Sequence, residues 1–315
     1  FHSFGFICLL IQPFQLGATL VVMPQWDTGV ALRLIAEERV TVHPAAPTNY
    51  LLEMAHPDFA RSDLSSLRAG LISGYVPPRE IFTQIEAGYP GMWLCNFWGS
   101  SETGPGLISP FDSPPEKRYL TVGRPVLGEE ARIVDPETCH AVRVGEPGEL
   151  QVRVPNVIRE YWNDPEETHR HLEPDGWFHT GDLARADEDG FFTIVGRLKD
   201  QINRGGLKIT PHDLEVEIEK YPGVSQVCVI GIPNPVLGES ICACVIPQAG
   251  AHVDLLELRA FLSQRVARNH LPDELCLLDE FPKLSGGVKI DKYGPRGLRA
   301  IVLARQDRQV FRKPR

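Results

Sequence analysis

Helical and strand-like segments alternate through the first half of the chain, and this alternation limits the fold more strongly than any other sequence feature. Apolar runs predict strands at 19–24, 40–43, 67–73 and 93–96, and helical periodicity predicts helices at 30–38, at 48–55 and from Ile81. Such βα repetition favours a largely parallel sheet covered by helices. Ligands of such sheets bind at the carboxyl ends of the strands, so polar residues at those ends are candidates for a site.

The polar stretch NFWGSSETGP follows the last of these predicted strands. Gly99 permits a tight turn, and the hydroxyl groups of Ser100 and Ser101 can donate hydrogen bonds to phosphate oxygens. Glu102 supplies an oxygen ligand suited to Mg²⁺, and Trp98 offers a flat face for a base. Taken alone, the stretch is more often an ordinary glycine-serine loop with a solvated glutamate.

From about residue 128 the pattern changes to short strands and turns, including a hairpin around the Asp189–Gly190 turn. Further elements are predicted as strands at 227–232, 241–246 and 275–278, a helix beginning near Thr210 and Pro211, and a helix at 255–269. The pattern of predicted strands and helices changes near 197–199. The sequence therefore predicts two domains, residues 1–198 and residues 199–315.

Other polar motifs lie beyond the first stretch. Asp182 in GWFHTGDLA is placed to accept both hydroxyls of a ribose, and Arg197 to bind the same sugar or balance a phosphate. The pair Gly205 and Gly206 would allow a ligand to approach the backbone closely. Lys289, beyond a Ser-Gly-Gly tip, can place a point charge on an anionic centre. Singly, a turn aspartate or a surface lysine is the more frequent explanation of each.

Composition excludes several classes of protein. The net charge of −9 argues against a general nucleic-acid-binding protein, and no apolar run is long enough for a membrane span. The seven cysteines lack paired metal-ligand spacing and mostly lie in apolar runs, which indicates free thiols in a reducing, cytoplasmic environment. The chain opens on Phe1 inside an apolar segment, which suggests a piece of a longer protein.

The motifs, taken in their order, resemble the adenylate-forming superfamily of acyl-CoA synthetases, luciferases and peptide-synthetase adenylation domains. The resemblance runs from Phe1 almost to Arg299. It includes FHSFG, RAGLISGYVPP, NFWGSSETG, GWFHTGDLA, GRLKDQINRGGLKITPHDLE and PKLSGGVKIDK. The fold implied is α/β: the C-terminal portion of a large adenylate-forming α/β domain, followed by a small mobile α+β domain.

The resemblance implies a binding role for most of these motifs. Trp98 takes the place of a tyrosine that stacks on adenine, and Asp182 and Arg197 hold the ribose. His2 borders the acyl group. The residues expected to bind nucleotide or CoA are Gly74, Tyr75, Val76, Asn96, Phe97, Trp98, Gly99, Asp182, Arg197, Gly205 and Gly206. Of these, Gly74–Val76 would line the adenine and acyl pocket, and Gly205 and Gly206 would flank the pantetheine tunnel.

The same resemblance assigns the reacting centre. Ser101 replaces a threonine at the α-phosphate, Glu102 is the Mg²⁺ ligand, and Lys289 is the catalytic lysine. Lys199 is the hinge between the domains. The chemistry implied is ATP-dependent activation of a small-molecule carboxylic acid to acyl-AMP, followed by thioester formation with CoA.

The sequence departs from the family pattern at three points. The phosphate loop expected upstream of FHSFG is not within these residues, and GYVPP is an unusual form of its segment. Val288 separates Gly287 from Lys289, so Lys292 competes for the catalytic role. Two alternatives to an acyl-CoA synthetase therefore stay open: an adenylation enzyme that loads a carrier protein, and an inactive nucleotide-binding fragment. Under each of these interpretations, the acyl-CoA synthetase included, the segment alone is expected to be inactive.

Overall fold

The computed structural model describes residues 4–73, 77, 79–126, 128–284, 290–305 and 308–311. The chain divides into two compact units, one from Phe1 to Ile194 and the other from Val195 to Arg315. The two units are described separately.

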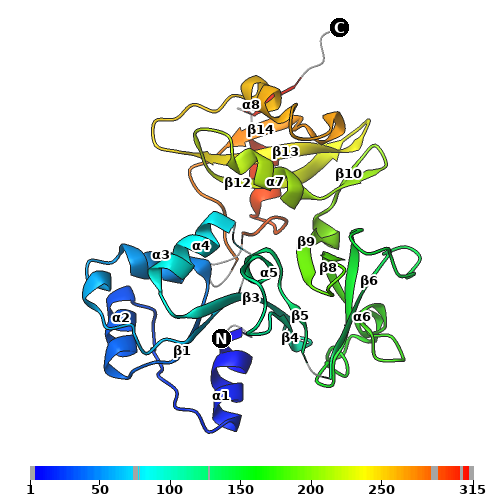
Figure 1. Ribbon diagram of the computed structural model, residues 1–315. Helices are drawn as coiled ribbons and strands as arrows, with labels where there is room; N and C mark the ends of the chain where they lie inside the picture. Colours follow the sequence, from blue (N-terminus) through cyan, green and yellow to red (C-terminus); the bar gives the residue numbers. More distant parts are fainter. Residues whose placement is uncertain are drawn as a thin grey trace. The chain divides into compact units, whose positions relative to one another are not determined.

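The first unit begins with a sheet in the order β1-β2-β3-β4-β5 (Figure 1). Its strands are β1 (Val42–Ala45), β2 (Ala69–Ile72), β3 (Trp93–Ser100), β4 (Gly104–Ile108) and β5 (Arg124–Pro125). β1, β2 and β3 pair in parallel, as the sequence predicts, whereas β4 and β5 extend the sheet in antiparallel fashion. The sheet is therefore mixed, and its parallel part comes from the βα repeats.

Helices of the first unit share a hydrophobic core with β1, β2 and β3, through side chains such as Ile35, Tyr50, Phe82 and Leu94. The helical segments before the second sheet are η1 (Phe4–Ile11), α1 (Gln12–Gln15), α2 (Thr28–Glu37), α3 (Pro47–Ala55), η2 (Phe59–Arg61), α4 (Arg79–Gly88) and α5 (Pro115–Leu120). Local chemistry sets where α2 begins, because Asp27 accepts a hydrogen bond from Val30 N as an N-cap.

A second sheet completes this unit, in the order β6-β7-β8-β9. Its elements are β6 (Glu130–Val134), β7 (Gly148–Arg153), α6 (Pro165–His171), β8 (Phe178–Ala186) and β9 (Phe192–Arg197), and the boundary between the two units falls within β9. The predicted Asp189–Gly190 turn joins β8 to β9. Inward-facing apolar residues of these strands form a core with Trp98 and Leu107, so this sheet packs against the β3–β4 hairpin.

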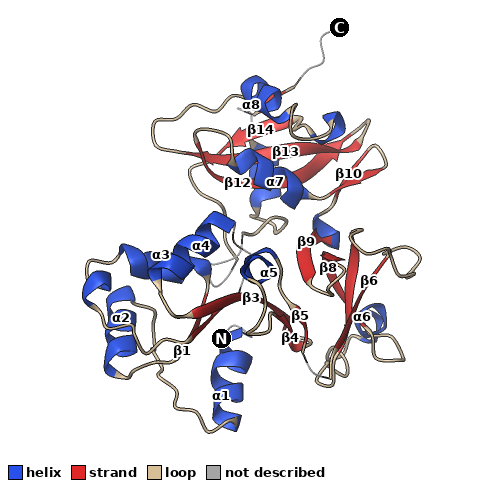
Figure 2. Ribbon diagram, viewed as in Figure 1, coloured by secondary structure: helices blue, strands red, loops and turns tan. Residues whose placement is uncertain are grey.

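The second unit is built around a sheet of six strands (Figure 2). Its strands are β10 (Ile202–Arg204), β11 (Leu207–Ile209), β12 (Val224–Asn234), β13 (Gly238–Pro247), β14 (Glu274–Leu277) and β15 (Gln309–Val310). Its helical segments are η3 (Leu198–Asp200), α7 (Pro211–Glu219), α8 (Leu255–Leu262), η4 (Arg268–His270) and α9 (Leu298–Ala304).

The period-two alternation of β13 explains why helices cover both faces of this sheet. Ile241, Ala243 and Val245 join the core that includes α7 and α8. Cys242 and Cys244 point the other way and join the core that includes α9. Both cysteines are buried free thiols on one strand face, as the sequence predicts.

Two sequence predictions of elements need correction. The run 19–24, predicted as a buried strand, contains no strand, and Val22 is 72% exposed. An apolar run forms a strand only where a neighbour accepts its hydrogen bonds, and no described strand pairs with this one. The helix predicted at 255–269 ends at Leu262 and is followed by a turn, in which the N–H groups of Arg265 and Val266 both donate to the Leu262 carbonyl.

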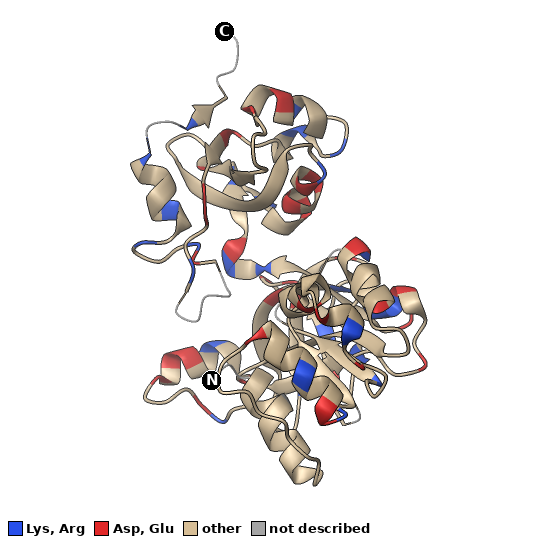
Figure 3. Cartoon of the chain, turned by 90° about the vertical axis from the view of Figure 1, so that its left-hand side faces the viewer, with Lys and Arg blue, Asp and Glu red and all other residues tan. Residues whose placement is uncertain are grey.

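Charged side chains are distributed over both units. Lys and Arg are interspersed with Asp and Glu along the ribbons of both units (Figure 3). Of the helices in the described part of the chain, none has the length and apolar character that a membrane crossing requires.

Candidate functional site

The turn between β3 and β4 carries Ser101 and Glu102. β3 continues through Ser100 and β4 begins at Gly104, so most of NFWGSSETGP is strand, not loop as its polarity suggests. The Ser100 hydroxyl accepts from the backbone N–H of Glu102 at 3.1 Å and of Thr103 at 3.2 Å. Ser100 thus closes the turn, while Ser101 is exposed at its tip.

Gly99 is required by the backbone of the hairpin. A Cβ at Gly99 would lie 2.4 Å from the carbonyl oxygen of Gly104, which is too close for any side chain. Gly104 itself has φ +67°, in the left-handed region. The two glycines therefore let β3 and β4 approach closely and present the turn.

The Glu102 carboxylate is oriented from a segment far away in the sequence. The Tyr161 hydroxyl donates to Glu102 Oε1 at 3.2 Å, and Ile158 N donates to the Glu102 carbonyl at 2.8 Å. Asn156 Nδ2 donates to the Thr103 carbonyl at 2.8 Å. Burial, together with the nearby Glu102 charge, raises the pKa of Tyr161 to about 12, so Tyr161 stays a donor at neutral pH.

Trp98 and Asp182 are joined by a direct hydrogen bond. The indole Nε1–H donates to Asp182 Oδ2 at 2.8 Å, although 84 positions separate the two residues. Both side chains are buried, and the Trp98 ring lies against Gly106, where an added Cβ would come within 2.8 Å of it. The structure thus brings together Trp98 on β3 and Asp182, the residues predicted to bind adenine and ribose.

Asn96 and Phe97 precede Trp98 on β3. Asn96 is buried, and its Nδ2 donates to the carbonyl oxygens of Arg118 and Tyr119 at 3.2 and 3.1 Å, which ties β3 to the end of α5. The Phe97 ring lies 5.7 Å from the Phe4 ring. Both positions have a packing role in the hairpin, and their predicted contact with nucleotide stays a prediction.

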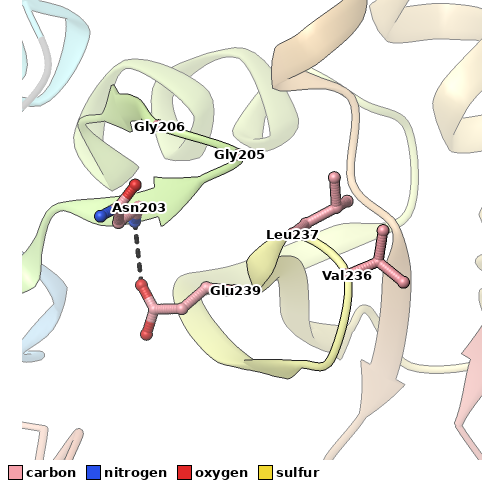
Figure 4. Close-up of a pocket in the computed structure, with 7 residues that line it drawn as sticks. Asn203, Gly205, Gly206, Val236, Leu237 and Glu239 are labelled. Atoms are coloured by element: carbon pink, nitrogen blue, oxygen red, sulfur yellow. Dashed lines mark hydrogen bonds between the residues drawn. The ribbon is translucent and has the colours of Figure 1, made fainter.

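In the second unit, Gly205 and Gly206 form the β10–β11 turn and line a pocket (Figure 4). Their φ angles of +62° and +86° explain why glycine occupies both positions. The Gly205 N–H donates to the Leu237 carbonyl at 2.7 Å. The full lining consists of Asn203, Gly205, Gly206, Val236, Leu237, Gly238 and Glu239. Asn203 N donates to Glu239 Oε2 at 2.9 Å, the dashed line in Figure 4.

Arg197 ends β9, and Lys199 lies in the single helical turn η3 that follows. Their predicted roles at the ribose and at the hinge stay predictions. The same holds for His2, Gly74, Tyr75, Val76 and Lys289, which lie outside the described residues.

Lys292, the alternative to Lys289, is held between two carboxylates of its own unit. Its Nζ lies 3.7 Å from Asp200 Oδ2 and 3.5 Å from Glu215 Oε1. Burial alone would lower the pKa of Lys292, but the charges of Glu215 and Asp200 outweigh it and raise the pKa above the ordinary lysine value. Lys292 is therefore a paired structural cation in this arrangement.

Sequence reasoning missed several residues around the site. Tyr161 and Asn156 orient the Glu102 turn, and Glu149 lies beside the Asp182 segment. No local pattern distinguishes these residues, because each acts on a partner distant in the chain. Within the described ranges, no three His, Cys, Asp or Glu side chains gather into a metal-binding cluster.

Comparison with known proteins identifies the family of the chain. The model of the AMP-binding enzyme family matches residues 1–162, and that of the AMP-binding enzyme C-terminal domain matches residues 213–287. The chain is 33% identical over 294 residues to a putative acyl-CoA synthetase, YngI, of Bacillus subtilis, covering 93% of this chain and 53% of that protein. It is 36% identical to a feruloyl-CoA synthase of an Amycolatopsis species, covering 91% of this chain and 58% of that protein.

The fold is also similar to solved structures. ATP-bound MatB from Rhodopseudomonas palustris superposes with a TM-score of 0.82 at 29% identity, covering 91% of this chain and 56% of MatB. The chain thus spans somewhat more than half the length of these relatives. The ordered motifs, the α/β fold and these matches together show that the chain belongs to the AMP-binding enzyme family, that is, to the adenylate-forming superfamily.

Proposed function

We propose that the chain supplies the nucleotide-binding region and C-terminal domain of an acyl-CoA synthetase. The enzyme would use ATP to activate a carboxylic acid and then join it to CoA. The observation that supports the proposal is the hydrogen bond between Trp98 and Asp182, two candidates for nucleotide binding that lie far apart in the sequence. The similarity to a putative acyl-CoA synthetase and to a feruloyl-CoA synthase supports the thioester product.

Asp182 would accept the ribose hydroxyl groups. A carboxylate has about four lone-pair sites, so Oδ2 can receive the Trp98 indole while the group also accepts from a sugar. Trp98 fixes the orientation of the carboxylate before the nucleotide arrives, which lowers the cost of ordering it on binding. ATP bound in the MatB structure supports this use of the region.

Glu102 fits a magnesium site by its chemistry. Mg²⁺ in nucleotide enzymes is usually held by one or two carboxylates together with substrate phosphates and water. Glu102 offers a carboxylate oriented by Tyr161 at a turn whose tip carries the exposed Ser101 hydroxyl. When bound there, the ion would neutralise charge on the phosphates.

The chemistry has two half-reactions. A carboxylate oxygen attacks the α-phosphorus of ATP, the bond from that phosphorus to the bridging oxygen breaks, and pyrophosphate leaves. The thiol of CoA loses its proton to solvent, the resulting thiolate attacks the acyl carbon of acyl-AMP, the bond from that carbon to the phosphate oxygen breaks, and AMP leaves. No side-chain nucleophile is needed, so positioning and charge neutralisation carry the catalysis.

Lys289 would stabilise the α-phosphate charge in the first step only. The pairing of Lys292 with Asp200 and Glu215 favours Lys289 for this role, because Lys292 already neutralises two carboxylates. We further propose Lys199 as the hinge between domains 1–198 and 199–315, and the pocket at Gly205 and Gly206 as the path of pantetheine. The buried free thiols agree with a reducing, cytoplasmic environment.

The two half-reactions give a direct test in the protein at its full natural length. Lys289→Ala should depress adenylation by orders of magnitude, since a lost charged transition-state contact is worth about 3 kcal/mol or more. The same variant, given preformed acyl-AMP and CoA, should make thioester at nearly the normal rate.

Lys292→Ala serves as the matched variant. If Lys292→Ala alone shows the split between the two half-reactions, Lys289 is the wrong lysine. If wild type forms acyl-AMP but transfers it to a carrier protein and never to CoA, the adenylation assignment holds and the acceptor is wrong. Absence of acyl-AMP with every carboxylic acid tried would refute the proposal.

A further inference from the structure

The Asp182 segment interrupts the pairing of β7 with β8. Glu149 pairs with Leu183, and Gln151 pairs with His179, with a register shift between the two pairs. Leu150 on β7 therefore faces three residues of β8, namely Thr180, Gly181 and Asp182. Such a bulge leaves backbone groups without ladder partners and is common next to active sites.

Side chains satisfy the backbone of this bulge. The Gly181 N–H donates to Glu149 Oε1 at 3.1 Å, and Gly181 adopts φ +68°. The Thr180 hydroxyl donates to the Leu150 carbonyl at 2.6 Å and accepts from Asp182 N at 3.0 Å. Glu149 and Thr180 thus fix the backbone on both sides of the peptide that leads into Asp182.

Glu149 is in turn fixed by His179. The ring Nδ1 of His179 lies 2.9 Å from Glu149 Oε2, and Nε2 lies 2.8 Å from Glu173 Oε1. A carboxylate at each nitrogen favours the protonated form of the ring, in which both nitrogens donate. The hydrogen bond to Glu149 accordingly raises the pKa of His179 above the ordinary value.

Other charged groups around this pair come from neighbouring elements. Arg132 of β6 lies 3.5 Å from Glu173 Oε2, and its Nε donates to Gln151. His171 of α6 contacts the His179 carbonyl through Nδ1 at 2.7 Å and Glu167 through Nε2 at 3.2 Å. The Glu149 side chain is only 6% exposed, and it contacts His179 and the Gly181 N–H.

We propose that Glu149 is a positioning residue for ribose recognition: it holds the bulge that aims the Asp182 carboxylate at the sugar. The inference rests on the proposed function, because it takes Asp182 as the ribose ligand. Trp98 orients the carboxylate from one direction, and Glu149 fixes the backbone from which the carboxylate projects. In this role Glu149 does not touch the nucleotide itself.

The test compares equilibrium binding of ATP and of 3′-deoxy-ATP to the protein at its full natural length. The wild type should prefer ATP, and Asp182→Ala should lose that preference. Glu149→Ala should reduce the preference by about tenfold or more, the order expected for losing a hydrogen bond to a charged group, while binding of 3′-deoxy-ATP changes little.

Two further variants separate positioning from general structural support. Glu149→Gln keeps an oxygen for the Gly181 N–H, and its amide can donate to a neutral His179, so it should retain most of the preference. Glu130→Gln on β6 is the matched control, because Glu130 pairs with Arg153 at the exposed surface and should have no effect.

The outcomes are distinct. Equal weakening of both nucleotides by Glu149→Ala would show a merely structural role and overturn the inference. A wild type that binds the two nucleotides equally would instead overturn the ribose role of Asp182 within the proposed function, and this inference with it. If Glu149→Ala does not fold, His179→Gln removes the support of Glu149 Oε2, and full ATP preference in that variant would refute the inference.

Discussion

Replacing Trp98 with phenylalanine removes the indole N–H that donates to Asp182 Oδ2 while keeping an aromatic ring in the same core. A hydrogen bond to a charged group contributes about 1.5–3 kcal/mol, and the smaller ring leaves a cavity that adds to the loss. Because Trp98 is only 8% exposed, water cannot replace the lost donor at low cost. We therefore expect Trp98→Phe to lower the free energy of unfolding by several kcal/mol.

A double-mutant cycle isolates the bond from the packing. Trp98→Phe, Asp182→Ala and the double variant are compared with wild type by urea unfolding followed by far-UV circular dichroism. The coupling energy should be about 1.5–3 kcal/mol, because the second substitution no longer breaks a bond that the first has removed. Trp162→Phe is the control: Trp162 is 87% exposed, and its replacement should change stability by less than about 0.5 kcal/mol. Additive effects of the two buried substitutions would refute the reasoning.

Three further predictions each concern a single side chain. Tyr161→Phe removes the donor to Glu102 Oε1, so it should raise the magnesium concentration needed for half-maximal adenylation about two- to tenfold; an unchanged magnesium titration would contradict that role. The pKa of His179 is raised by Glu149, so the stability that wild type gains over His179→Gln should be complete below about pH 6.5. That gain should shrink as pH rises through the folded-state pKa of His179. Urea unfolding at several pH values measures it, and a gain that grows with pH would contradict the raised pKa. Cys139 is exposed, whereas burial raises the pKa of Cys95 and Cys228 to about 12, so Cys139→Ser should remove one rapidly reacting thiol in native-state labelling. Unchanged fast labelling would contradict this exposure.

Elements with strong local signals could be predicted from the sequence. α2, α3 and α4 have helical periodicity, and the parallel pairing of β1, β2 and β3 follows from the βα repeats that contain them. The predictions that are wrong concern segments whose secondary structure depends on tertiary contacts. The run 19–24 is apolar but has no described strand beside it, and β3 continues through Ser100 because β4 pairs with it.

The sequence offers candidate residues for the site but not how they lie relative to one another. Motif order makes Trp98, Glu102 and Asp182 candidates, yet no local pattern shows that the Trp98 indole meets the Asp182 carboxylate. Tyr161 acts on Glu102 across 59 positions, and Glu149 acts on Gly181 across a bulge that depends on strand register. Such contacts depend on how the two sheets of the first unit pack, which periodicity and turn chemistry do not specify.

The most direct measurement of the central claim is exchange of radiolabelled pyrophosphate into ATP by the protein at its full natural length, with and without carboxylic acids. The account predicts exchange that depends on a carboxylic acid and on magnesium, and that falls by orders of magnitude in Asp182→Ala and in Lys289→Ala. Exchange that is independent of any acid, or no exchange across a broad panel of aliphatic and aromatic acids, would contradict the claim that these residues form an adenylate-forming site.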